Sequence, residues 1–131
     1  MTIREFSKYV VFACMMLILC GCSKPILIGT DAAVYSRGSL YAVAGQDLDS
    51  VYKATLAAMK QLEIEIAEQN KDVFYAKVIG KIADGRTVTI RLEPGADKST
   101  ELEIQTSTFG NEERSRVIYK KIQENLKTVS K

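Results

Sequence analysis

After residue 38 the chain contains short stretches in which apolar and polar residues alternate, the pattern of strands buried on one face. In the clearest of them Val88, Ile90 and Leu92 alternate with polar residues, directly after Asp84-Gly85. Asp-Gly between two such stretches is a strong hairpin signal. Alternation and β-rich composition predict five strands, over Ser39–Ala44, Leu62–Ile66, Phe74–Ile82, Thr87–Leu92 and Glu101–Thr106, with a turn at Asn70–Asp72 and a loop at Glu93–Thr100.

Two other stretches have apolar residues at spacings of three and four, which predicts helices. Asp47 is placed to cap the first helix, and Asp49 lies in its first turn, opposite the positive end of the helix dipole. Asn111 is placed to cap the second helix, with Glu112 and Glu113 in its first turn. The apolar stripes are Leu48, Val51, Tyr52, Thr55, Leu56, Met59 and Leu62 in the first helix and Ile118, Ile122, Leu126 and Val129 in the second.

The predicted order is therefore strand, helix, four strands and a final helix. Because an alternating antiparallel sheet needs cover on only one face, both helices are expected to pack on that face. The predicted fold class is α+β, a two-layer sandwich with an antiparallel sheet of about five strands and two helices on one face. The opposite face is expected to be wet, with Arg91 facing outward Glu side chains on neighbouring strands.

The amino-terminal residues follow a different pattern, which is typical of a secretion signal. Arg4 and Lys8 precede the uncharged apolar run Tyr9–Leu19. This run has 11 residues, whereas a transmembrane helix needs about 20 to cross the hydrocarbon core. The pattern therefore favours a cleaved signal over a spanning helix.

The end of the apolar run, Leu19-Cys20-Gly21-Cys22-Ser23, resembles the lipobox of bacterial lipoproteins. In such proteins a diacylglyceryl group is joined to the cysteine thiol, and the chain is cut before that cysteine and after a small residue. The resemblance implies cleavage between Gly21 and Cys22 and a lipid on Cys22, although Cys20 is less usual at its position. Ser23, where Asp would favour retention, implies transport to the outer membrane, facing the periplasm. The alternative is that Cys22 is an ordinary buried thiol in an uncleaved anchor.

These patterns divide the chain into a signal peptide (residues 1–21), a lipidated tether (22–38) and one α+β domain (39–131). Pro25, Gly29 and Gly38 suit a tether. The apolar run Ile26–Ile28 leaves two alternatives open, because it can pack on the domain or rest against lipid.

Composition narrows the classes of function. Without residues 1–21 the chain keeps 110 residues, with 16 basic and 15 acidic side chains interleaved, and nucleic-acid binding is not expected because no basic stripe is present. All three cysteines lie in the first 22 residues, and the chain has no His, the usual general base and the commonest metal ligand. No phosphate-binding glycine motif follows a predicted strand. The sequence therefore predicts no enzymatic activity, no metal and no cofactor.

Three segments of the domain resemble a family of uncharacterised bacterial lipoproteins known only as a domain of unknown function. They are Gly38–Tyr41, Asp84–Ile90 and Thr108–Glu113, the last followed by Ser115 and Ile118. The resemblance covers most of the mature chain. It implies a fold and a location, but it brings no mechanism.

The last of these segments predicts a junction between a strand and a helix. Phe109 is expected to plug the edge of the core, Gly110 to free the backbone, and Asn111 to cap the helix. The side chains of Glu112, Glu113 and Arg114 are a candidate surface contact, the alternative being simple capping and charge placement.

The sequence as a whole favours a membrane-anchored bacterial lipoprotein that acts as a non-enzymatic binding or scaffold module. Its expected partners are the membrane, through the lipid on Cys22, and a protein of the cell envelope. The alternative function is a carrier or chaperone for an apolar ligand such as a lipid, held between sheet and helices.

Overall fold

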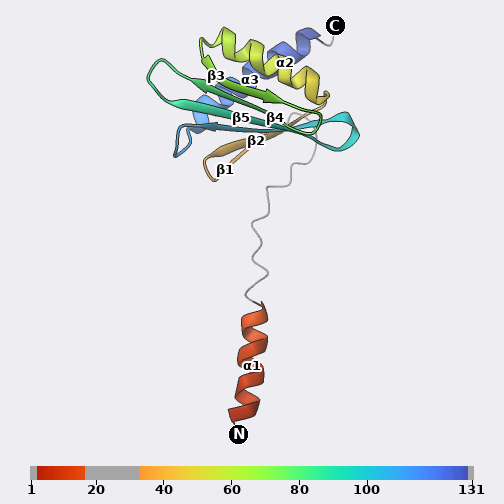
Figure 1. The fold of residues 1–131 in the computed structure, drawn as a ribbon, viewed down its shortest axis with the longest axis vertical. Coiled ribbons are helices and arrows are strands. Elements are labelled where there is room, and N and C mark those ends of the chain that lie inside the picture. The colour runs from red at the N-terminus through yellow and green to blue at the C-terminus, as the bar shows by residue number, and fades with distance from the viewer. Residues whose placement is uncertain (1–2, 17–32, 130–131) are drawn as a thin grey trace.

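The computed structural model describes residues 3–16 and 33–129 (Figure 1). α1 lies in the segment predicted as a secretion signal, and the other elements make up the α+β domain. The elements in chain order are α1 (Ile3–Met16), β1 (Ala33–Ser36), β2 (Ser39–Ala44), α2 (Leu48–Gln61), β3 (Glu65–Lys71), β4 (Ala76–Lys81), β5 (Thr87–Pro94), the short 3-10 turn η2 (Ala96–Lys98), β6 (Thr100–Thr106) and α3 (Glu112–Val129).

The strands of the described residues form one antiparallel sheet in the order β1-β2-β6-β5-β4-β3. The predicted α+β sandwich is confirmed, with six strands where about five were expected. The additional strand is β1, which lies within the residues assigned to the tether, so the sheet begins at Ala33 rather than at Ser39. β1 has only four residues and pairs with β2 alone. Such a short edge strand offers no alternation that a sequence reading could detect.

One face of the sheet is buried across its four central strands, β2, β6, β5 and β4, as the alternation predicted. Leu40 lies opposite Ile104, which lies opposite Ile90, which lies opposite Val78. All four side chains are fully buried. Since burying one such side chain stabilises a protein by roughly 1.5–3 kcal/mol, this cross-strand row is the centre of the core.

Two helices cover this face and contact each other (Figure 1). α2 lies over β3, β4 and β5, whereas α3 lies over β2 and β6. The predicted cap of α2 is confirmed, because the Asp47 carboxylate accepts a hydrogen bond from the Ser50 backbone N–H at 3.0 Å. The side-chain amides of Gln61 on α2 and Asn125 on α3 exchange hydrogen bonds of 3.1 and 3.0 Å, which join the two helices.

Gly80 lets α2 approach β4 closely. A Cβ atom at this position would overlap Met59 Cε and would lie 2.6 Å from Ile64 Cγ2. Met59 is fully buried, so its side chain occupies the space that a larger residue at position 80 would need. The inward position of Gly80 follows from the alternation, but the close approach of the helix does not.

β3 begins later than the strand predicted over Leu62–Ile66. Leu62 is the C-cap residue of α2, and Glu63 has a φ angle of 57°, so the chain turns there before it extends. β3 then runs through residues that the sequence assigned to a turn. Its pairing with β4 shifts register between Ile66 and Glu68, which marks a β-bulge on a mostly exposed edge strand.

The sheet has two ends, and each carries a distinct set of loops. At the entry end β1 begins at Ala33, and the β3–β4 turn (72–75) and the β5–β6 loop (95–99) project beyond the strands. The cap end carries the β1–β2 turn (37–38), the β4–β5 turn (82–86) and the β6–α3 junction (107–111). In Figure 1 the cap end lies on the left of the sheet and the entry end on the right.

At the cap end two glycines bring distant parts of the chain into contact. Gly38 and Gly110 have φ angles of 84° and 82°, a region that favours glycine. A Cβ atom on Gly110 would overlap the Tyr35 hydroxyl and the Gly38 carbonyl oxygen, and would lie 2.6 Å from Gly38 Cα. Gly110 therefore frees the backbone as predicted, and it also seats the β6–α3 junction on the β1–β2 turn.

Replacing Gly110 with Ala tests this contact against a matched control. Gly85 has a similar φ angle of 86°, but no atom lies within 4 Å of its added Cβ. Gly85→Ala should lower the free energy of unfolding by about 1–2 kcal/mol, because it adds only backbone strain. Gly110→Ala adds steric overlap with the backbone of residue 38, so it should lower the free energy of unfolding by about 2–5 kcal/mol. Urea unfolding followed by circular dichroism measures both values, and equal losses would show that the close approach to Gly38 contributes nothing.

Candidate functional site

The predicted lipidation and cleavage residues, Cys22 and Gly21, lie outside the described residues. α1, which precedes them, is described from Ile3 to Met16, and Tyr9, Val10 and Val11 on it are exposed. Among the described helices none is both long and apolar enough to span a membrane.

The start of α3 is built as the sequence predicted, around Asn111. Its side-chain oxygen accepts a hydrogen bond from the Arg114 backbone N–H at 2.9 Å, which caps the helix. Its backbone carbonyl accepts hydrogen bonds from the Thr106 hydroxyl at 2.9 Å and from the Ser115 N–H at 3.0 Å. Thr106 and Ser115 are both buried, and their hydroxyl oxygens lie 3.2 Å apart. These bonds hold the end of β6 against the first turn of α3.

The three candidate contact residues, Glu112, Glu113 and Arg114, do not act as one group. Glu112 accepts hydrogen bonds from the Arg116 guanidinium at 2.8 and 3.0 Å, one turn further along α3. Glu113 and Arg114 instead line an open hollow of about 300 Å³ on the surface of the domain. Glu113 and Arg114 therefore share the lining of one hollow, whereas Glu112 forms an ion pair within the helix.

The hollow lies against one side of the first two turns of α3. Asn111 and the half-exposed Val117 complete its lining. Arg114 reaches from it to the β4–β5 turn, where its guanidinium lies 3.2 Å from the Asp84 carboxylate. The hollow thus offers a small apolar patch beside one acidic and one basic side chain.

Phe109 does not plug the core edge, so that prediction was wrong. Its side chain is 93% exposed. The reason is that Ser107 has a φ angle of 62° and turns the chain after β6, and the carbonyl of Phe109 then faces Gly38. The backbone of residue 109, rather than its side chain, fills the edge. A large aromatic ring is left in water two residues before the hollow begins.

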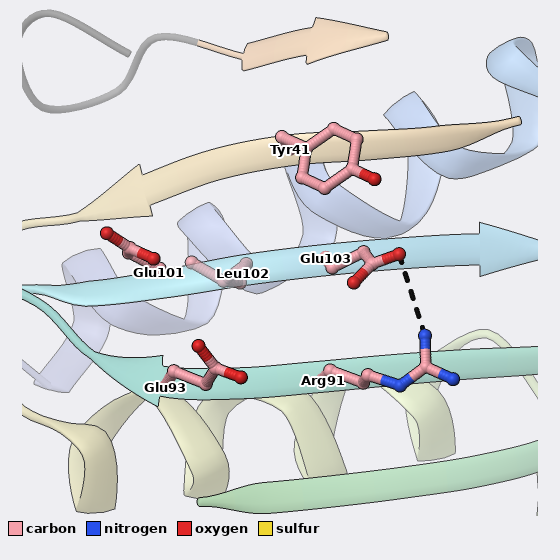
Figure 2. A pocket seen from close by; sticks show the side chains of 6 residues that line it. All are labelled: Tyr41, Arg91, Glu93, Glu101, Leu102 and Glu103. Atoms are coloured by element: carbon pink, nitrogen blue, oxygen red, sulfur yellow. Dashed lines mark ion pairs between the residues drawn. The ribbon is translucent and has the colours of Figure 1, made fainter. Parts of the chain in front are cut away.

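A second, much smaller depression lies on the open face of the sheet. It is lined by Tyr41, Arg91, Glu93, Glu101, Leu102 and Glu103 (Figure 2). Arg91 and Glu103 are paired across β5 and β6 at 3.5 Å, which confirms the predicted cross-strand pairing. The depression has about 30 Å³ of space, close to the volume of one water molecule. It is too small for an organic ligand.

Potential metal ligands and buried polar side chains both occur in the described residues. No group of three potential acidic, Cys or His ligands comes together in them. Every buried side-chain nitrogen or oxygen within the same ranges has a hydrogen-bond partner. The candidate sites of this part of the chain are therefore surface sites.

The sequence reading missed one further pair of exposed apolar residues, Val73 and Phe74. They are 77% and 80% exposed in the β3–β4 turn. The alternation predicts that a strand begins at Phe74, but β4 starts only at Ala76. Asp72 was the available signal, because its side chain accepts the Phe74 N–H at 2.7 Å in the manner of a turn-forming Asp.

Fold and surface together define a small α+β domain with one covered sheet face and with two hollows on the surface of its described residues. The profile of a family described as a protein of unknown function (DUF3568) matches residues 7–125. This match covers most of the chain, so the chain belongs to that family. No curated protein matches it significantly.

The link between Arg114 and Asp84 can be tested through a pKa. The pKa of Asp84 is lowered, first by the hydrogen bond from the Arg86 backbone N–H and then by the Arg114 guanidinium. Because the folded-state pKa is depressed, the link stabilises the fold above the unfolded-state pKa of Asp84, and its contribution is lost as pH falls through the folded value.

Arg114→Gln should raise the Asp84 pKa but leave it below its ordinary value, since the Arg86 hydrogen bond persists. A carbon-detected NMR titration of the Asp84 carboxyl measures this change, and Arg116→Gln serves as the control because Arg116 pairs with Glu112. An Asp84 pKa that is the same with and without Arg114 would contradict the ion pair.

Proposed function

We propose that this protein is a lipid-anchored bacterial envelope protein that acts as a non-enzymatic binding or scaffold module. The observation that carries the binding role is the cap end, where Phe109 is 93% exposed two residues before Asn111, the first residue that lines the hollow of about 300 Å³. Exposed aromatic residues next to a hollow are typical anchors of protein interfaces. The partner is a protein of the cell envelope.

The sequence supports the anchor. A basic segment, an apolar run and the lipobox-like Leu19–Ser23 follow one another in the order found in lipoprotein signals. With Ser23 after the lipidated Cys22, the proposed location is the outer membrane, facing the periplasm.

A binding role fits the geometry better than a carrier role. Both hollows described above lie on the surface, one at the start of α3 and one on the open sheet face. A carrier for a lipid would hold it between the sheet and the helices, where Leu40, Met59 and Ile104 are packed with no exposed surface. A non-enzymatic role accords with a chain that has no His.

The anchor is tested at Cys22. Cys22→Ser should abolish metabolic labelling with a radioactive fatty acid and leave an uncleaved precursor, because the thioether can form only on the thiol. Cys20→Ser is the matched control and should be labelled and processed normally. Persistent labelling of the Cys22→Ser protein would overturn the proposed anchor.

The binding surface is tested by site-specific crosslinking in intact cells. A photoreactive amino acid in place of Phe109 should capture one recurring protein at native expression levels, and one in place of Phe74 should capture no protein. Adding Val117→Asp should weaken the capture from position 109 because Val117 lines the adjacent hollow. Val117 is half exposed, so the fold should tolerate this change. Recovery of only the uncrosslinked monomer from position 109 would contradict the binding role.

A further inference from the structure

The β3–β4 hairpin ends in two large apolar side chains that the fold does not use. The backbone N–H of Asp72 donates to the Tyr75 carbonyl at 2.8 Å, which closes the hairpin and leaves Val73 and Phe74 at its tip. They are 77% and 80% exposed. Hairpin tips are normally occupied by Gly, Asn, Asp or Ser. Because Val73 and Phe74 are largely exposed, these two side chains contribute little to the stability of the fold. Their apolar surface is therefore available to an external apolar phase.

The tip projects from the end of the sheet at which the proposed tether enters. Six residues form one cross-strand row: Lys71, Ala76, Leu92, Leu102, Ala42 and Ala33. The hairpin leaves this row directly after Lys71, and the chain that leads back to Cys22 leaves it at Ala33. Lys71 and Ala33 therefore lie at opposite edges of the same end of the sheet. They are roughly 24 Å apart, since six strands are separated by five spacings of about 4.8 Å.

The length of the connection holds this end close to the bilayer. Eleven residue steps separate Cys22 from Ala33. A chain of this length reaches at most about 36–40 Å when fully extended. A domain tied this closely meets the membrane surface at a high effective concentration, so two apolar side chains suffice for a second point of attachment.

The charges at this end favour an apolar contact over an electrostatic one. The Lys71 ammonium is bound to the Asp49 carboxylate, which also pairs with Lys53 at 3.0 Å. These two lysines hold the pKa of Asp49 below its ordinary value. The loop between β5 and β6 carries one anion and one cation, Asp97 and Lys98. Lys71 and Lys98 therefore each have an acidic neighbour, whereas Lys77 lies one register position further from the tip on β4.

We propose that Val73 and Phe74 insert into the lipid surface to which the domain is tethered, so that the domain docks on its entry end. This inference rests on the proposed lipid anchor at Cys22. The docking fixes the orientation of the domain and turns the cap end, with Phe109 and its hollow, away from the bilayer.

The chain contains no Trp, which allows a direct test with single indole reporters. The full lipidated protein is reconstituted at low density into phosphatidylcholine vesicles, with Phe74→Trp in one sample and Phe109→Trp in the other. Both positions are exposed, so both changes should be tolerated. The indole emission from position 74 should shift to the blue and lose most of its intensity when brominated lipids replace ordinary ones, with no dependence on salt. The emission from position 109 should remain that of an indole in water.

The possible failures are distinguishable. The mass of the reconstituted protein reports the lipid on Cys22, and an unlipidated chain overturns the anchor on which the inference rests. A lipidated chain whose reporter at position 74 stays in water overturns the docking alone. A reporter at position 74 that is blue-shifted but not quenched by brominated lipid indicates a second copy as the occupant, and this too overturns the proposal. Adding Val73→Ser to the Phe74→Trp protein should reduce the quenching by brominated lipid if the tip inserts as one unit.

Discussion

One face of a six-stranded antiparallel sheet has to be kept from water, and the rest of the structure follows from that requirement. Leu40, Ile90 and Ile104 lie in register on this face and are fully buried. The chain meets the requirement with two helices, of which α2 covers β3, β4 and β5 and α3 covers β2 and β6. The close approach of α2 depends on the missing side chain of Gly80, where a Cβ would meet Met59 and Ile64. With the core built between these layers, large apolar side chains in the loops at either end have no interior to enter.

The sequence predicts those parts of the fold in which a periodic pattern is long enough to read. The inward residues of β5 and β6, both helix caps and the Arg91–Glu103 pair were all predictable, because alternation and capping are local properties. β1 was not predictable, since four residues on an edge carry no period and their pairing partner determines them. The start of β3 was misplaced because Glu63 adopts a positive φ angle that its residue type does not signal.

In the candidate sites, too, the local features were predictable from the sequence and the contacts made on folding were not. The sequence located the start of α3 but could not determine that Glu112 pairs within the helix while Glu113 and Arg114 line a hollow. Phe109 was expected to plug the core edge and Phe74 to begin a strand, but both lie outside the strands and are exposed. Turns reverse the direction of a side chain over one or two residues, and periodicity carries no information at that scale. The exposed aromatics are therefore visible only in the folded chain.

The β-bulge on β3 has a consequence for copies of the protein that the proposed lipid anchor would hold in one membrane. Anchored neighbours would be confined to a plane and would present their sheet edges at similar heights, which favours edge-to-edge strand pairing and aggregation. β3 counters this with a register shift after Ile66 and with exposed Glu65, Glu68 and Lys71, since bulges and charges are features that discourage the joining of sheets. The opposite edge, β1, is only four residues long. Both edges of the sheet thus disfavour edge-to-edge polymerisation of the domain.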